Sequence, residues 1–231
     1  MSSQEKIRHY LFTSGLDALA DHIPVIEKSI HDFIAQLATP MEVSNDALYR
    51  YEVPLMSEDG TCSLIDEMNP VAYDLAKILG GESEANTRKL KLLNILVTRA
   101  NMVTGSDWVG VYQRRRLVSG SEALVKLAYR GRPSRAEFPL NAEFAQRSTN
   151  SEVALSGQAK LIDDVSAHVA EGGGFYVCDD AVQSELCVPL MDGDGTVIGI
   201  IDAEASPKAF FNADRQAAIV AMAMVAPALL P

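Results

Sequence analysis

Three strand-like segments of the sequence each carry side chains that could bind or transform a small molecule. Alternate residues of a strand point to opposite faces, and these segments contrast an aliphatic face with an aromatic or acidic one. The residues of interest are Trp108, Tyr112, Glu185, Cys187, Asp202 and Glu204. A Trp-Tyr wall beside carboxylates would suit an ammonium group, and Gly110 between the rings would let a ligand approach the backbone. The alternative is a solvated sheet face whose aromatics cover an edge.

The thiols and carboxyls of the chain could support covalent chemistry. The three cysteines, Cys62, Cys178 and Cys187, form neither a disulfide framework nor a metal-spaced pair. Cys178 precedes Asp179, whose negative charge is expected to raise the pKa of the thiol. Cys62 is interpreted as structural or incidental. No cofactor is predicted, and no metal site either, because Asp202 and Glu204 have no histidine or further oxygen ligand nearby in the sequence.

Four segments together resemble a known family. They read SDWVGVY at 106–112, YVCD at 176–179, SELCVPL at 184–190 and IGIIDAE at 198–204. In order and spacing they resemble the free methionine-(R)-sulfoxide reductases, which are single GAF domains, from about residue 85 onward. The resemblance implies an α+β fold with a GAF-type central antiparallel sheet flanked by helices, to which this chain adds an N-terminal helical segment.

The resemblance also implies roles for individual residues. Cys178 corresponds to the catalytic cysteine that attacks the sulfoxide sulfur and becomes a sulfenic acid. Trp108 and Tyr112 correspond to the aromatic wall of the substrate pocket. The acidic residues that correspond to those around the substrate are Glu185, Asp202 and Glu204, the last where the family more usually has aspartate. Carboxyls clustered in a closed pocket can hold raised pKa values and protonate the departing oxygen.

The sequence departs from the family at the residues that resolve the sulfenic acid. Members usually carry a resolving cysteine in a Gly-Val-Cys-Gly-like turn, whereas residues 145–151 read AQRSTNS here. Cys187 replaces an aliphatic residue of the family and shares a strand face with Glu185, so a Cys178–Cys187 exchange is one hypothesis. A lone cysteine on a sheet is more usually an inert core residue. Thioredoxin or glutathione could instead act as the reductant.

Hydrophobic periodicity predicts the elements that must position these residues. A helix is expected to begin after Ser83, a suitable N-cap, and to end at Gly105. Strands are predicted at 107–113, 122–129, 158–162, 184–191 and 196–205, and a final helix at 212–229. Residues 163–183 are expected to be irregular.

The chain is divided at Gly80-Gly81 into an N-terminal, mainly helical accessory segment (1–80) and a GAF domain (81–231). Helical spacing over residues 7–37 predicts two or three short helices. A short strand is predicted at 48–53 and another helix at 70–79.

Composition restricts the possible partners. The 231 residues carry a formal net charge of -11, which argues against nucleic acid or an anionic membrane as partner and favours a small-molecule ligand or another protein. The polar N-terminus is not a signal peptide, and the longest apolar run, 217–231, is shorter than the roughly 20 residues that span a bilayer. A cytoplasmic protein is therefore expected. By analogy with GAF domains that pair through helices, a homodimer is expected too.

Two functions remain open at this point. The first is an enzyme that reduces free methionine-(R)-sulfoxide through Cys178. The second is a non-catalytic GAF sensor that binds a small amino-acid-like ligand for signalling or dimer regulation. The helices of residues 1–80 favour the sensor, whereas Cys178 and the surrounding acids favour the enzyme. We place the enzyme slightly ahead.

Overall fold

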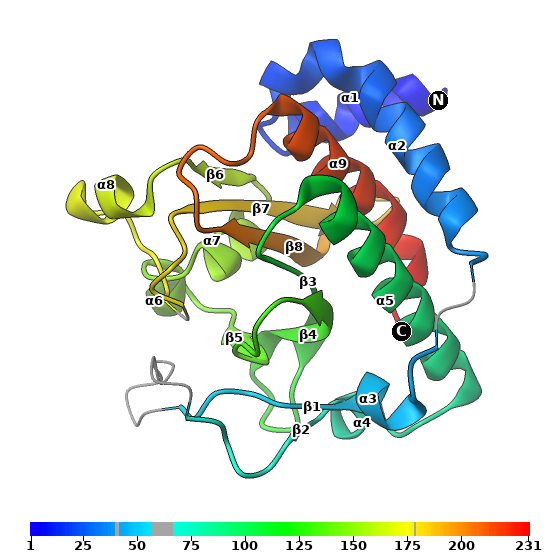
Figure 1. The fold of residues 1–231 in the computed structure, drawn as a ribbon, viewed down its shortest axis with the longest axis vertical. Coiled ribbons are helices and arrows are strands. Elements are labelled where there is room, and N and C mark those ends of the chain that lie inside the picture. The colour runs from blue at the N-terminus through cyan, green and yellow to red at the C-terminus, as the bar shows by residue number, and fades with distance from the viewer. Residues whose placement is uncertain (40–41, 57–66, 178) are drawn as a thin grey trace.

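The computed structural model describes residues 1–39, 42–56, 67–177 and 179–231. Within these residues the centre of the molecule is a six-stranded antiparallel sheet of order β5-β4-β3-β8-β7-β6 (Figure 1). Its strands are β3 (Trp108–Arg116), β4 (Glu122–Arg130), β5 (Glu137–Pro139), β6 (Lys160–Ile162), β7 (Ser184–Met191) and β8 (Val197–Ala205). The predicted α+β class and antiparallel sheet are confirmed, and β5 is the strand of this sheet that was not predicted.

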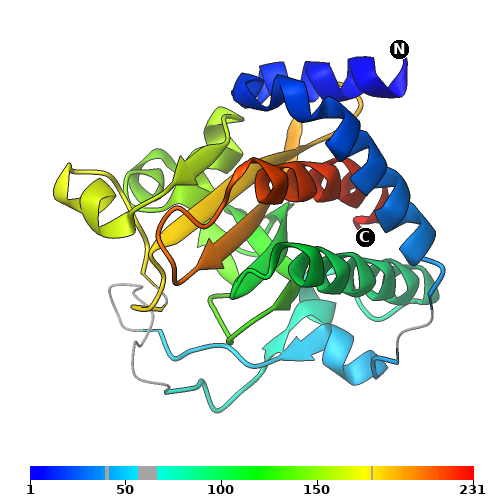
Figure 2. The same ribbon diagram turned by 45° about the horizontal axis from the view of Figure 1, so that its top comes forward.

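Helices α5 (Glu84–Thr104) and α9 (Ala213–Val225) cover one face of the sheet, and η2 (Ala226–Leu229) follows α9 (Figure 2). The Ser83 side chain accepts a hydrogen bond from the Asn86 amide at the start of α5. Gly105 ends that helix at φ 69°, a left-handed conformation that favours glycine. The aliphatic faces of the strands pack beneath these helices, as their alternation predicts. These buried strand residues are Val109, Val111, Leu186, Val188, Leu190, Ile201 and Ala203.

The N-terminal helices are α1 (Ser3–Thr13), η1 (Asp17–His22) and α2 (Ile23–Gln36), in agreement with the prediction of two or three short helices. Helix α2 lies along α9, and both views show the two side by side (Figures 1 and 2). Ile26 and Phe33 of α2 are buried in the same hydrophobic cluster as the residues beneath α5 and α9. The accessory segment and the GAF domain therefore share one core.

The rest of the N-terminal segment differs from its prediction. It forms α3 (Asn45–Tyr49), β1 (Arg50–Tyr51), β2 (Tyr73–Asp74) and α4 (Leu75–Ile78). The Ser44 side chain caps α3 by accepting from the Ala47 amide, so the predicted strand at 48–53 is reduced to two residues. Because Tyr73 pairs with Tyr51 in the two-stranded sheet, the helix predicted at 70–79 is reduced to the single turn of α4.

Three short helices lie outside the layer formed by α5 and α9. They are α6 (Ala142–Ala145), α7 (Thr149–Ser156) and α8 (Val165–Ala170). Val153 and Ala154 of α7 pack with Tyr112 and Cys187 on the second face of the sheet. Helix α8 falls in the stretch 163–183 that was predicted to be irregular. Among the described residues, none of the helices combines the length and the apolarity needed to cross a bilayer.

Candidate functional site

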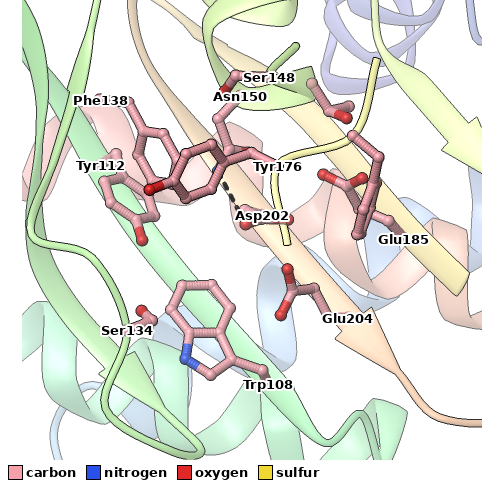
Figure 3. A pocket seen from close by; sticks show the side chains of 12 residues that line it. Trp108, Tyr112, Ser134, Phe138, Ser148, Asn150, Tyr176, Glu185, Asp202 and Glu204 are labelled. Carbon is pink, nitrogen blue, oxygen red and sulfur yellow. Dashed lines mark hydrogen bonds between the residues drawn. The ribbon is translucent and has the colours of Figure 1, made fainter. Parts of the chain in front are cut away.

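The second face of the sheet carries a pocket that brings the predicted aromatic and acidic residues together (Figure 3). Trp108 and Tyr112 come from β3, Glu185 from β7, and Asp202 and Glu204 from β8. The strand register explains their proximity, because Glu204 pairs with both Trp108 and Glu185. Trp108 is 5% exposed and Tyr112 is 1% exposed, so these rings do not merely cover a solvated edge.

Other residues of the pocket come from segments for which no clear helix or strand is predicted. They are Ser134, Phe138, Ser148, Thr149, Asn150, Phe175 and Tyr176. Ser148 is the N-cap of α7 and accepts from the Ser151 amide, so α7 begins at the pocket. A capping residue followed by Gly157 at φ 72° is the sequence signal that could have located this helix.

The ring of Trp108 lies over Gly110 and forms part of the pocket lining. Its ring stacks on Tyr129 with centroids 6.2 Å apart, and its indole nitrogen donates to the carbonyl of Arg132 at 3.1 Å. A Cβ atom on Gly110 would approach Cη2 of Trp108 to 2.2 Å. The structure thus assigns Gly110 a role other than the predicted one, because the space above it is filled by the tryptophan ring rather than by a ligand.

The two central carboxyls, Glu185 and Asp202, are buried, and each has an oxygen with no hydrogen-bond partner among the described residues. Glu185 is 2% exposed and Asp202 is 3% exposed. Burial raises the pKa of Glu185 well above its ordinary value, and the neighbouring Asp202 and Glu204 raise it further. Burial raises the pKa of Asp202 to about 6, while the hydrogen bond from Asn150 acts in the opposite direction. The surroundings of Glu185 therefore favour the protonated form of its carboxyl.

Three buried oxygens at this point have no well-aligned hydrogen-bond partner among the described residues, namely Glu185 Oε2, Asp202 Oδ1 and Thr149 Oγ1. Asp202 and Thr149 nevertheless lie close enough to Glu185 to affect its pKa. Unpaired buried polar atoms are uncommon and costly in folding free energy. This cluster is therefore suited to accept hydrogen bonds from a ligand or to exchange a proton with it.

Asn150, which sequence reasoning missed, connects the carboxyls to the neighbouring thiol. Its Nδ2 atom donates to Asp202 Oδ2 at 3.1 Å, and its Oδ1 atom accepts from the sulfur of Cys187 at 3.4 Å. The residue lies in the stretch 145–151, where the resembled family has its resolving cysteine. Asn150 binds one oxygen of Asp202, and the other, Oδ1, has no hydrogen-bond partner in the part of the chain that the structure describes.

The structure describes one of the three cysteines, Cys187. Cys178 and Cys62 lie outside the described residues. Cys187 is fully buried, and burial, with Asp202 nearby, raises the pKa of its thiol well above the usual value. It packs with Tyr112 and α7 and is not among the described residues that line the pocket. The predicted exchange between Cys178 and Cys187 stays a prediction.

The glycines before Cys178 allow their segment to pack closely against the connection between α6 and α7. A Cβ atom on Gly174 would lie 2.1 Å from the carbonyl oxygen of Gln146. A Cβ atom on Gly173 would lie 2.2 Å from the ring of His168. His168 contacts the Gly174 carbonyl through Nε2 at 3.3 Å. The histidine thus contacts this loop, and it is not among the described residues of the pocket.

A loop between β4 and β5, residues 131–136, borders the pocket, which its residue Ser134 lines, and is called here the roof loop. Tyr112 donates its hydroxyl hydrogen to the carbonyl of Arg135 at 3.3 Å. Arg135 in turn donates from Nη1 to the hydroxyl of Tyr176 at 2.8 Å. With these contacts made, the space open to the centre of a water molecule is about 20 Å³. This space holds one water but no amino acid, so a larger ligand requires the roof loop or Tyr176 to move.

The acidic residues do not form a recognisable metal site. Within residues 1–39, 42–56, 67–177 and 179–231, no group of three or more histidine, cysteine, aspartate or glutamate side chains is arranged to hold a metal ion. The chemistry that this pocket offers is that of aromatic contact, acceptor oxygens and a transferable proton.

Comparison with known proteins places this geometry in a family. The family model of the GAF domain matches residues 90–229. The structure is similar to that of a type II free methionine-R-sulfoxide reductase from Thermoplasma acidophilum, with 22% identity, a TM-score of 0.54, and coverage of 63% of this chain and 94% of that one. No curated protein matches the chain.

Two further solved structures illustrate the range of similar proteins. A free methionine-R-sulfoxide reductase from Neisseria meningitidis, solved with its substrate, has 21% identity and a TM-score of 0.44, with 64% of this chain and 89% of that chain covered. A putative GAF sensor protein from Burkholderia vietnamiensis has 24% identity and a TM-score of 0.43, with 62% and 88% covered. At these identities the similarity concerns the fold. The chain belongs to the GAF domain family.

Proposed function

We propose that the protein reduces free methionine-(R)-sulfoxide, with Cys178 as the nucleophile. The observation that carries this proposal is the pair of buried carboxyls, Glu185 and Asp202, whose pKa values are raised beside an aromatic wall. Reduction of a sulfoxide by a thiol requires an acid to protonate the departing oxygen, and the raised pKa of Glu185 suits its carboxyl to this role. A binding pocket for an unreactive ligand has no comparable need for a protonated carboxyl.

The reaction is an oxygen transfer. The Cys178 sulfur attacks the substrate sulfur and forms a sulfur–sulfur bond while Glu185 donates a proton to the sulfoxide oxygen. The protonated oxygen then bonds to the Cys178 sulfur as the sulfur–sulfur bond and the substrate's sulfur–oxygen bond break. This step leaves a sulfenic acid on Cys178 and releases methionine, and the proton of the Cys178 thiol restores Glu185. Two external thiols then reduce the sulfenic acid to the thiol, with release of water and formation of a disulfide between them.

The substrate's ammonium group is assigned to the aromatic and acidic wall. Glu204 is only partly buried, pairs with Trp108 across the strands and lines the pocket with it, so its carboxylate lies beside the indole. Cation–π attraction and a charge-assisted hydrogen bond would act on the same group. The roof loop must open to admit the substrate, since the closed pocket has room for one water.

The reductant that completes the cycle is proposed to be external, such as thioredoxin or glutathione. Cys187 is a weak candidate for a resolving thiol because burial and nearby carboxylates keep it protonated, and only the thiolate is a good nucleophile. Cys187→Ser is therefore expected to retain turnover, whereas an internal exchange would require the sulfur of Cys187.

A non-catalytic sensor is the second candidate, favoured by two observations. The stretch 145–151 has no cysteine, and the N-terminal helices share a core with the domain that holds the pocket. In this account a small amino-acid-like ligand would alter the packing of α1 and α2, through which two copies would pair. Light scattering of the protein with and without free methionine tests both the proposed homodimer and its response to ligand.

The experiment that separates the two functions is an assay of free methionine-(R)-sulfoxide loss with dithiothreitol or thioredoxin. The native chain is compared with Cys178→Ser and with Cys187→Ser, and calorimetry measures binding of the sulfoxide to each. Turnover that Cys178→Ser abolishes and Cys187→Ser retains supports the reductase with an external reductant. Binding without turnover in the native chain contradicts the reductase and supports the sensor.

A further inference from the structure

A fully buried lysine holds the roof loop from below. Lys126 of β4 has no exposed surface. Its ammonium donates to the backbone oxygen of Ser134 at 2.6 Å and to the Ser134 hydroxyl at 2.9 Å. Its backbone amide donates to the carbonyl of Ala136 at 2.9 Å. Burial of a lysine is costly in free energy unless its charge is satisfied, and two of the groups that contribute here belong to Ser134 of the roof loop.

Lys126 is also enclosed by two tyrosines, one of which comes from the N-terminal segment. Its ammonium lies 4.1 Å from the ring centroid of Tyr129 and 5.1 Å from that of Tyr51, distances typical of cation–π contacts. The Tyr51 hydroxyl, in β1, donates to the backbone oxygen of Lys126 at 2.8 Å. Tyr129 stacks on Trp108 in the pocket wall. A continuous series of contacts thus joins the N-terminal segment to the ligand pocket.

A second N-terminal tyrosine contacts the other end of the roof loop. Tyr73 of β2 packs against Tyr51 with ring centroids 5.3 Å apart, and its hydroxyl donates to Glu137 Oε1 at 2.5 Å. The backbone oxygen of Glu137 accepts from Nε of Arg135, the residue that reaches Tyr176 across the pocket. The two adjacent tyrosines of β1 and β2 therefore contact both flanks of the roof loop.

We propose that Tyr51 and Lys126 are positioning residues of the ligand pocket, through which the N-terminal segment fixes the roof loop over Trp108 and limits the size and entry rate of the ligand. This inference rests on the proposed function only in treating the pocket as a ligand site. It gives part of the segment 1–80 a role in binding. Because hydrogen bonds from Trp108 and Tyr112 also end on the roof loop, loosening the loop should expose the indole.

Trp108 is the single tryptophan of the chain, so its fluorescence reports how well the roof loop shields the indole, and no ligand is needed for the measurement. Acrylamide quenching is measured for the native chain, Tyr51→Phe and Lys126→Met. Removal of the Tyr51 hydroxyl is expected to raise the quenching constant about two-fold or more, and removal of the ammonium to raise it further. The matched control is Tyr10→Phe, because the Tyr10 hydroxyl also donates to a backbone oxygen, that of Pro189, at 2.8 Å, and Tyr10 is not among the described pocket residues.

Circular dichroism and thermal unfolding establish that each variant is folded at the assay temperature. If Lys126→Met does not fold, Tyr51→Phe and Ser134→Ala decide the question, since each removes one hydroxyl. Quenching of folded Tyr51→Phe equal to that of the native chain overturns the proposal. An equal rise in Tyr10→Phe also overturns it, because it indicates general loosening.

The same variants give a kinetic result if the protein turns over the sulfoxide. Tyr51→Phe is expected to change KM about two- to ten-fold with kcat little altered, because it alters entry to the pocket and not the reacting groups. A fall in kcat with KM unchanged contradicts a positioning role in ligand entry. If no turnover exists, the proposed reductase fails while the quenching result still decides the role of Tyr51.

Discussion

The buried residues on the two faces of the central sheet have opposite effects on the stability of the fold. Beneath α5 and α9, residues such as Val111, Leu186 and Ile201 have no exposed surface and carry no polar side-chain atoms. On the other face, Glu185 and Asp202 are almost as buried, but within the described residues one oxygen of each has no hydrogen-bond partner. Hydrophobic burial stabilises the first face, whereas desolvated carboxyls destabilise the second. The difference indicates that the pocket face is adapted to binding or chemistry at some cost in stability.

The largest effect on stability is expected at the aliphatic face. Leu186 and Cys187 are neighbours in β7, both fully buried, and their side chains lie on opposite faces. Leu186→Ala is expected to lower the free energy of unfolding by about 3 kcal/mol through lost burial and a cavity. Cys187→Ala removes a single sulfur atom and should cost about 1 kcal/mol. Urea unfolding of both variants checks this, and equal losses would contradict the contrast between the faces.

On the pocket face, by contrast, removal of a buried charge is expected to raise the free energy of unfolding at neutral pH. The folded pKa of Asp202, about 6, lies above its unfolded value, so the folded state binds more protons and loses stability as the pH rises from about 4 through 6. Asp202→Asn keeps an acceptor for Asn150 and removes this charge. It should stabilise the protein by about 1–3 kcal/mol above pH 6 and by little at pH 4.

Thermal unfolding of the native chain and Asp202→Asn across this pH range provides the measurement. The native chain carries many other carboxyls, so only the difference between the two proteins reports Asp202. A gain that is the same at pH 4 and pH 7 would show that the charge of Asp202 is not what destabilises this face.

A smaller change in the free energy of unfolding is expected when Asn150, which hydrogen-bonds to both Asp202 and Cys187, is replaced. Asn150→Ala removes one hydrogen bond to each partner and should cost about 1 kcal/mol. Because that hydrogen bond lowers the pKa of Asp202, the carboxyl should titrate at a higher pH in the variant. NMR titration of the Asp202 carboxyl measures the shift. A downward shift would mean that Asn150 does not stabilise the charged form.

Much of the fold could be predicted because local signals and tertiary packing agree. In β3, β7 and β8 both faces are buried, and the strict alternation of Val109 and Val111 with Trp108 and Tyr112 fixes which side chains share the pocket. Ser83 and Gly105 mark the ends of α5. The aromatic and acidic residues of the site were therefore accessible from strand parity together with the family resemblance.

The remainder of the site could not be predicted, for identifiable reasons. Helix α7 begins with Thr149, Asn150 and Ser151, which are buried although polar, so it lacks the apolar periodicity of a packed helix. Their burial is explained only by distant groups, such as the Pro139 carbonyl that accepts from Ser151 at 2.9 Å. Closure of the pocket likewise depends on the contact between Arg135 and Tyr176, which are far apart in the sequence.

The central claim, that this pocket performs chemistry, is tested most directly by a single turnover without any reductant. The native chain, Cys178→Ser and Cys187→Ser are each mixed with excess free methionine-(R)-sulfoxide, and methionine and sulfenic acid are quantified per chain. The account predicts about one methionine per native chain and per Cys187→Ser chain, with a sulfenic acid on Cys178, and none from Cys178→Ser. Absence of methionine from a native chain that binds the sulfoxide would contradict it, whatever reductant is later supplied.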